Sequence, residues 1–300
     1  MGVYIGERDV VLVRGEDATS YLQGQVSQDV AGLGVGKSAW SLILQPQGKV
    51  DAWFRITRTG QDAYVLDVDA GFGEALLSRV KRFMLRVKVD LELDTWVLHA
   101  YDTALPEDTA LPEDTVLPAA TGLPDVEAPI VAPSADGCGV DIVGPDLDDS
   151  DVVADNEHRS TAEYTRRRIE GGIPAMGAEL GASTIPAEAG VVNRSVSFTK
   201  GCYTGQELVA RVDSRGDNTP RRLRIVSGSG QAPASGDELY ADDANAGIIT
   251  SVADTGDGWI ALAYVRRSAL KRSELALDAR SVDVRPTPWD IEAQTISGSP

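Results

Sequence analysis

The most specific stretch of the chain is Lys200-Gly201-Cys202-Tyr203-Thr204-Gly205-Gln206-Glu207-Leu208. Its spacing is that of a capping box. In that arrangement a threonine hydroxyl accepts from the N–H three residues on, and an acidic side chain at that position bonds back to the threonine N–H. Thr204 and Glu207 occupy those two positions. The pattern predicts a helix that begins at Gly205 and continues through the apolar residues after it.

Cys202 lies two residues before the predicted cap, and Lys200 lies two residues before the cysteine. Helix N-termini and nearby cations favour the thiolate, and they can lower a cysteine pKa from about 8.5 toward about 3.5–7.5. One interpretation is therefore an activated, partly accessible thiol, whose thiolate form is favoured by the nearby Lys200 cation. The other is a small buried residue in a tight turn, which lone cysteines often are. The local pattern leaves both open.

The charge of the chain is concentrated in one segment. The 300 residues hold 28 Lys and Arg against 46 Asp and Glu, a net charge of −18. Residues 89–158 contain 18 of the acids and no Lys or Arg, so the remainder is neutral. An acidic protein of this kind is not expected to bind nucleic acid directly, because neutralising phosphates needs a basic face. Residues 159–224 are locally basic, with 11 Lys and Arg against 7 acids, which is typical of a charged, solvated surface or, less commonly, of a site for a small anion.

Composition also bears on compartment and metal binding. No apolar run approaches the roughly 20 residues of a membrane span, and no signal peptide is visible at the start. The two cysteines, Cys138 and Cys202, are too few for a disulfide scaffold or a four-cysteine metal site. His99 and His158 have no metal-ligand spacing and are expected to be structural or exposed. We expect a cytoplasmic protein with no membrane partner and no metal site of its own.

The pattern of apolar residues predicts an α+β chain. The first hundred residues predict strands at 9–14, 39–44, 50–56, 64–68, 87–93 and 95–100, a helix after Asp17 and a helix at 71–83. Residues 104–121 repeat a six-residue Leu-Pro unit, which we interpret as an acidic surface loop. A helix is expected over 160–170. From 222 onward, short strands at 223–226, 246–252, 259–265 and 275–284 are typical of a small antiparallel barrel or sandwich, and 286–300 reads as a frayed tail.

Three motifs together resemble a known family. The stretch KGCYTGQE at 200–207 resembles the signature of YgfZ-type folate-binding proteins, relatives of the T-protein (aminomethyltransferase) of the glycine cleavage system. The segment GQVSQDV at 24–30 is similar to the N-terminal motif of that family, and RIEGGIP at 168–174 resembles the T-protein R-x-E-x-G-x-P segment. The resemblance spans most of the chain except 102–158.

The resemblance implies an α+β fold in three parts around a central folate site. Residues 1–48 and 159–215 would form a discontinuous folate-binding domain. Residues 49–158 would form a ferredoxin-like domain with an acidic insertion at 102–125, and 216–300 a C-terminal antiparallel β-barrel and tail.

The resemblance also implies ligand residues for tetrahydrofolate. Glu170 aligns with the T-protein glutamate that binds the pterin, and a carboxylate suits two donors of such a ring; otherwise it is a helix-end partner of Arg166 or Arg167. Tyr164 would stack near the folate or be a core residue, and Asp29 would be a pterin-side residue or a turn residue. The remaining expected contacts, to the folate glutamate tail, are Arg194 and Arg215.

Two departures from the T-protein pattern bear on function. Asp51 is a single acid where the T-protein has two, and Cys202 stands where the T-protein has no cysteine. Both favour the YgfZ-type role, which is tetrahydrofolate-dependent support of iron–sulfur cluster assembly or repair. Its partners would be iron–sulfur client or assembly proteins, with effects on tRNA modification. The alternatives are a one-carbon transferase with Asp51 as base, and an interaction module whose acidic insertion docks a partner.

Overall fold

The computed structural model describes residues 2–103, 129–149, 156–214, 218–278 and 280–290. The acidic repeat at 104–121 and Arg215 lie outside these residues. The chain divides into two compact units, the first made of 1–159 with 194–206 and the second of 160–193 with 207–300. The predicted boundaries of a three-part chain stay a prediction.

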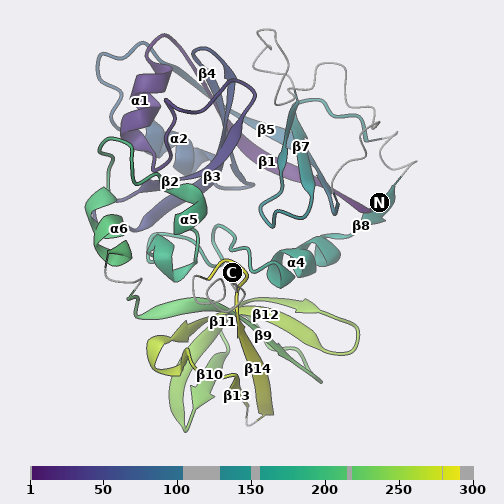
Figure 1. Ribbon diagram of the computed structural model, residues 1–300. Helices are drawn as coiled ribbons and strands as arrows, with labels where there is room; N and C mark the ends of the chain where they lie inside the picture. Colours follow the sequence, from purple (N-terminus) through teal and green to yellow (C-terminus); the bar gives the residue numbers. More distant parts are fainter. Residues whose placement is uncertain (1, 104–128, 150–155, 215–217, 279, 291–300) are drawn as a thin grey trace, which may run out of the picture. The chain divides into compact units, whose positions relative to one another are not determined.

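The first unit is built on one sheet, which Figure 1 shows in purple to teal. Among its described residues the strands are β1 Gly2–Arg14, β2 Ser38–Leu44, β3 Val50–Gly60, β4 Ala63–Asp69, β5 Asp90–Tyr101, β6 Ile130–Pro133, β7 Val140–Gly144 and β8 Glu157–Arg159. Their order is β2-β3-β4-β1-β5-β7-β6, with β8 parallel to the start of β1. Val10 to Val13 in β1 are all buried, as a strand in the middle of a covered sheet requires.

Strand β5 is continuous where the sequence predicts two strands. Asp94 and Thr95 interrupt the apolar pattern, but they pair with Val10 and Asp9 of β1 without a break in register. Ladder hydrogen bonds are made by the main chain, so polar side chains do not end a strand whose partner continues. The predicted interruption is therefore wrong.

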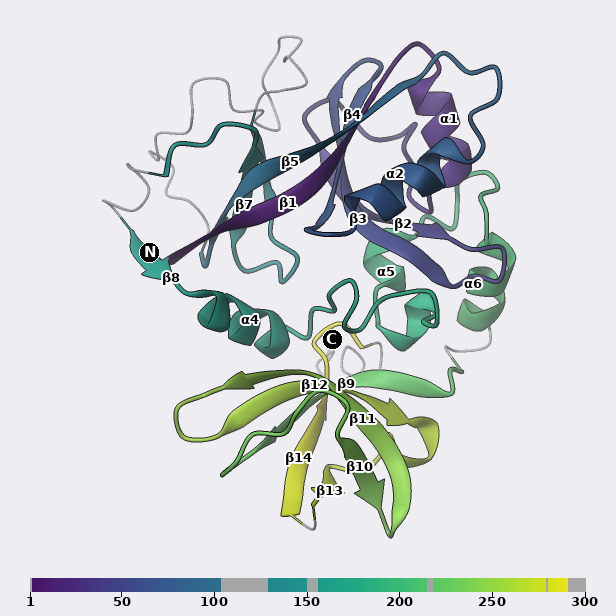
Figure 2. The same ribbon diagram turned by 180° about the vertical axis from the view of Figure 1, so that it is seen from behind.

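Two helices accompany this sheet, α1 Ala18–Gln25 and α2 Gly73–Lys81 (Figure 2). Asp17 occupies the N-cap position of α1, as predicted, but its side chain makes no cap bond and accepts instead from the N–H of Lys88 at 2.8 Å. Helix α2 is shorter than the predicted 71–83, and packs Leu76, Leu77 and Val80 inward.

A group of buried charges crosses the sheet of the first unit. Asp67 is completely buried and accepts from Arg8 at 3.0 Å and from Arg55 at 2.9 Å. Arg55 also reaches Asp141 at 3.0 Å, and lies 5.8 Å from the ring centre of Trp40. Each buried charge thus has an opposite partner, which burial requires. Sequence reasoning missed this network because its members are far apart along the chain.

The second unit contains a closed barrel. Its described strands are β9 Arg221–Gly228, β10 Glu238–Ala241, β11 Ala244–Asp254, β12 Trp259–Arg266, β13 Glu274–Leu277 and β14 Arg280–Pro286, in the order β10-β11-β12-β9-β14-β13. Trp259, Leu239 and Val226 are in its core. The α+β class and the antiparallel barrel predicted from the sequence are confirmed. The stretch 275–284, predicted as one strand, forms the hairpin β13–β14, which turns at Asp278 with φ of +46°.

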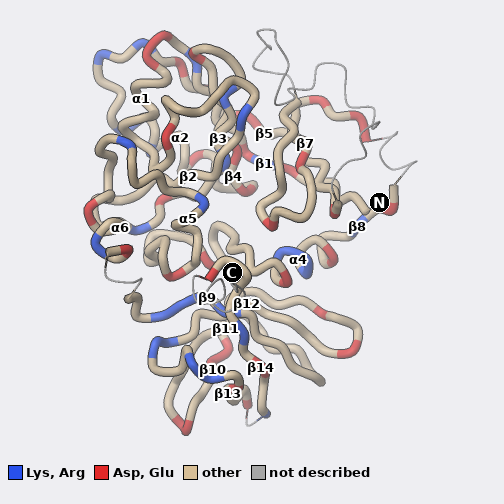
Figure 3. Tube along the Cα trace, in the orientation of Figure 1, with Lys and Arg blue, Asp and Glu red and all other residues tan. Residues whose placement is uncertain are grey.

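Helix α4, Thr161–Glu170, precedes the barrel in the chain and packs on β11 and β12. Ser160 and Glu163 form a complete capping box at its start, and Ile169 is buried against barrel residues. Figure 3 shows basic residues along α4 and β9. Thr287 and Asp290 are buried, so the described part of the predicted frayed tail, up to 290, is anchored. Among the described residues no helix is long and apolar enough to span a membrane.

Candidate functional site

The signature loop rests on the β2–β3 turn of the first unit. Helix α6, Gln206–Asp213, begins one residue later than predicted, because Gly205 has φ of +83° and cannot be its first helical residue. A Cβ at Gly205 would lie 2.7 Å from the main-chain oxygen of Gln45 and 2.9 Å from Cβ of Leu44. Only glycine allows both the conformation and the close approach.

The side chain of Glu207 does not fill the role predicted for it. Its carboxylate lies 2.5 Å from Arg211, one turn along α6, and is 87% exposed. The side chain therefore turns along the helix and not back to Thr204. The arginine one turn on offers the carboxylate an alternative partner, in a pair worth roughly 0.3–0.5 kcal/mol.

Lys200 is bound to the main chain of another segment. Its Nζ donates to the oxygen of Gln23 at 2.5 Å, of Val26 at 2.6 Å and of Gln28 at 3.1 Å. Burial lowers the pKa of Lys200 to about 8, against the opposing effect of the Asp29 carboxylate. The ring of Tyr203 lies 5.1 Å from the ammonium. Lys200 thus has three carbonyl partners that the sequence did not reveal, and its predicted effect on Cys202 stays a prediction.

Cys202 is exposed, as is Cys138, so the interpretation of Cys202 as a buried turn residue is wrong. Tyr203, which follows it, is 7% exposed, and burial raises the pKa of Tyr203 to about 12. The Tyr203 hydroxyl is buried without a hydrogen-bond partner among the described residues. The loop therefore buries its tyrosine and presents its thiol outward.

The N-terminal motif at 24–30 forms the segment that Lys200 holds. Asp29 accepts from the Gln23 side chain at 2.9 Å and from the N–H of Gly32 at 3.4 Å, so it has the turn role that sequence reasoning left open. Two motifs linked in the sequence only by family resemblance are thus in direct contact.

Asp51 braces the turn on which the signature loop rests. One carboxylate oxygen accepts from the Gln45 side chain at 2.9 Å, and the other from Nε of Arg79 at 2.9 Å. Arg79 also donates to the oxygen of Leu44 at 2.8 Å and is 7% exposed. Sequence reasoning missed Arg79, although a basic residue beside Leu76 and Val80 on the apolar side of a helix was a usable signal.

Arg194 holds another turn of the first unit. It lies in α5, Val192–Ser195, and donates to the main-chain oxygen of Ala135 at 2.5 Å. Burial lowers the pKa of Arg194 to about 10, against the opposing effect of Asp136. Its side chain is therefore engaged with the β6–β7 turn. Its predicted contact with a folate tail stays a prediction.

Glu170 and Tyr164 lie on α4, in the second unit. Glu170 is 45% exposed and pairs with Arg166 at 3.0 Å, as the simpler alternative anticipated. Two residues earlier, Arg168 donates to Glu179 at 3.0 Å and to the oxygen of Ile173 at 2.7 Å. In the R-x-E-x-G-x-P motif, Arg168 is therefore held by its partners, whereas Glu170 is accessible to solvent. Tyr164 is half-buried on the same helix.

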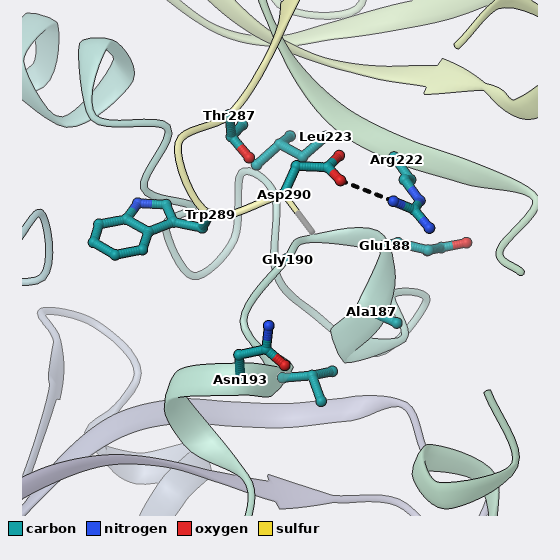
Figure 4. Close-up of a pocket in the computed structure, with 10 residues that line it drawn as sticks. Ala187, Glu188, Gly190, Asn193, Arg222, Leu223, Thr287, Trp289 and Asp290 are labelled. Carbon is teal, nitrogen blue, oxygen red and sulfur yellow. Dashed lines mark hydrogen bonds and ion pairs between the residues drawn. The ribbon is translucent and has the colours of Figure 1, made fainter. Parts of the chain in front are cut away.

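A small cavity of about 20 Å³ lies in the second unit (Figure 4). Asp290 binds Arg222 there at 2.9 Å, and Trp289 donates from Nε1 to the oxygen of Gly171 at 2.9 Å. This cavity has room for about one water. Trp289 therefore adjoins the end of α4 that carries Glu170, a placement hidden within the predicted tail.

No group of three His, Cys, Asp or Glu in the described part of the chain is arranged to hold a metal ion. His99 is buried and bonded to Asp149 at 2.6 Å, and His158 is exposed, as expected for structural and surface residues.

Comparison with known proteins gives consistent findings. The family profile described as "CAF17, C-terminal beta-barrel domain" matches residues 221–290. The "tRNA-modifying protein YgfZ" of Enterobacter sp. (strain 638) is 23% identical, covering 93% of this chain and 90% of that protein. The "Iron-sulfur cluster assembly factor IBA57 homolog, mitochondrial" of Mycosarcoma maydis is 29% identical, covering 71% of this chain and 53% of that protein.

Among solved structures, the glycine cleavage system aminomethyltransferase T from Bartonella henselae is similar, with a TM-score of 0.76 and 18% identity. The match covers 96% of this chain and 86% of that one, and at this identity it shows the fold alone. The chain is therefore similar over nearly its whole length to YgfZ proteins, carries a CAF17-type C-terminal barrel and has the T-protein fold, which confirms the resemblance seen in its motifs.

Proposed function

We propose that this protein is a tetrahydrofolate-binding accessory protein that supports iron–sulfur cluster assembly or repair, and that Cys202 is its functional thiol. The observation that carries the proposal is the exposed Cys202 on a loop anchored on both sides, by Lys200 and by Gly205. Similar proteins are named as a tRNA-modifying protein and as cluster assembly factors. A presented thiol suits contact with a client or assembly protein.

The side chains around the end of α4 suit a folate. Glu170 is a half-exposed carboxylate, which can accept from the amino and ring N–H groups of a pterin. Trp289, bonded to Gly171, supplies an aromatic ring beside this end, and Tyr164 lies near the start of the same helix. Tetrahydrofolate, when bound, is a carrier of one-carbon groups. We propose Glu170 and Tyr164 as ligand residues, with Asp29, Arg194 and Arg215 as further candidates.

A one-carbon transferase with Asp51 as base has less support. The hydrogen bonds that Asp51 accepts from Gln45 and from Arg79 hold its carboxylate as part of the β2–β3 turn, which is the arrangement of a structural residue. The carboxylate instead supports the turn beneath Gly205.

Folate binding is tested by anaerobic calorimetric titration of tetrahydrofolate into wild type, Glu170→Ala and Glu207→Ala. The control is closely matched, because Glu207 is also an exposed glutamate paired with an arginine one turn away. We expect micromolar binding, about −8 kcal/mol, to wild type and the control, and weaker binding to Glu170→Ala. Equal affinity in all three proteins would remove Glu170 from the site, and no binding to folded wild type would remove folate from the proposal.

The role of the thiol is tested in a deletion strain that carries either Cys202→Ala or Cys138→Ala. Both thiols are exposed, so the two substitutions remove equivalent groups. We expect iron–sulfur enzyme activity to fall in the deletion strain, to be restored by Cys138→Ala and to stay low with Cys202→Ala. Full restoration by Cys202→Ala would show that the thiol has no part in the function.

A further inference from the structure

The acceptors of Lys200 lie at a favourable place for a cation. The oxygen of Gln23 belongs to the last turn of α1, and those of Val26 and Gln28 follow directly after it. Carbonyls at a helix C-terminus carry the negative end of the helix dipole. An ammonium group has three protons, and here each has an acceptor. Lys200 is therefore fully engaged with this segment.

A second set of bonds joins the same two segments through Ser27. Its main-chain oxygen accepts from the N–H of Ser197 at 3.0 Å, and its hydroxyl donates to the oxygen of Ser195 at 2.5 Å. The hydroxyl also accepts from the N–H of Leu42 at 2.8 Å, in β2. The chain leading to Lys200 is thus attached to the sheet as well as to the end of α1.

Cys202 lies between this attachment and a second one. Gly201 separates it from Lys200, and a Cβ at Gly201 would meet no atom of the described residues within 4 Å. Beyond the cysteine, Gly205 fits closely against Gln45 of the β2–β3 turn. The thiol is exposed in a short span with both ends held.

We propose that Lys200 is a positioning residue, which clamps the start of the signature loop to the segment after α1 and so determines where the Cys202 thiol is presented. It acts through its three carbonyl bonds and not by lending its charge to the thiol. The importance of this position rests on the proposed function of Cys202, whereas the clamp itself is measurable in the isolated protein.

The clamp is tested with a nitroxide spin label on Cys202 in a Cys138→Ser background. Matched variants are Lys200→Met and, as a control for charge, Lys37→Met, which removes an exposed lysine of the same unit. We expect a restricted nitroxide spectrum in the background protein and in Lys37→Met, and a mobile spectrum in Lys200→Met. An unchanged spectrum in a folded Lys200→Met would overturn the proposal.

Two further measurements separate the clamp from other roles. The pH midpoint of Cys202 alkylation by iodoacetamide should be the same in wild type and Lys200→Met. If the Lys200 cation acted on the thiol, its removal would shift that midpoint by about 1 unit or more. Amide exchange at 24–30 and 197–204 should rise about tenfold or more, since bonds to a charged group are lost. A shifted midpoint with unchanged exchange would assign Lys200 to the thiol instead.

If Lys200→Met does not fold, Lys200→Gln provides the test, because its amide retains two of the three donors. We expect intermediate nitroxide mobility there, and a spectrum identical to the background would overturn the clamp. None of these readouts needs folate or a client protein. A failed clamp and a failed functional role for Cys202 are therefore distinguishable.

Discussion

The signature loop and the end of helix α4 share one arrangement with different partners. In each, a basic residue is largely buried and the residue two positions later is exposed: Lys200 precedes Cys202, and Arg168 precedes Glu170. Lys200 donates its hydrogen bonds to main-chain oxygens, whereas Arg168 also binds the completely buried carboxylate of Glu179. In both motifs the basic residue acts as the anchor, which leaves its neighbour available to a ligand or partner.

The largest effect is expected at the anchor that faces a buried charge. Arg168→Met leaves the Glu179 carboxylate without its counter-charge, and breaking a buried pair costs about 3–5 kcal/mol. Urea unfolding measures the loss, and Glu179→Gln added to Arg168→Met should recover part of it. A loss below about 1 kcal/mol, the range of surface pairs, would contradict this account.

Gly205→Ala, in the signature loop, should lower the free energy of unfolding by about 2–4 kcal/mol. The loss comes from the left-handed backbone conformation at this position together with the overlap of a Cβ with the main-chain oxygen of Gln45. Gly201→Ala is the control in the same loop, because its Cβ would meet nothing among the described residues; it should change stability by less than about 1 kcal/mol. Equal losses of stability in the two variants, measured by chemical denaturation, would show that Gly205 makes no close contact with the β2–β3 turn.

The burial of Lys200 should also make stability depend on pH. The folded pKa of Lys200 is about 8, below its ordinary value of 10.5, so between these values the folded state binds fewer protons than the unfolded state. The unfolding free energy of wild type should therefore rise with pH relative to Lys200→Met across pH 8 to 10.5. Urea melts at steps of half a pH unit measure this. Parallel curves of unfolding free energy against pH for the two proteins would exclude a depressed pKa of Lys200.

The smallest effect is expected at the exposed pair. Arg166→Met removes the partner of Glu170, where both side chains are 45% exposed, and should change stability by no more than about 0.5 kcal/mol. The same thermal or urea melt compares it directly with Arg168→Met. A loss as large as that of Arg168→Met would erase the distinction between the two arginines.

Sequence reasoning was accurate where structure depends on near neighbours. The helix at 160–170 and the barrel strands at 223–226, 246–252 and 259–265 follow from apolar spacing at intervals of two to four residues, and each forms close to where it is predicted. It was inaccurate at boundaries. The break expected near Asp94 disappears because β1 continues the ladder, and the helix after the signature loop begins at Gln206 because Gly205 has a positive φ.

The sequence by itself determined the fold class, the barrel, the family resemblance and the candidate residues Cys202 and Glu170. Only the tertiary structure decided that Lys200 bonds to a segment 177 residues away, that Arg79 donates to one carboxylate oxygen of Asp51, and that Arg168 pairs with Glu179. The reason is physical: every residue has the same main-chain carbonyl. No sequence pattern can therefore mark which carbonyls a distant lysine will bind.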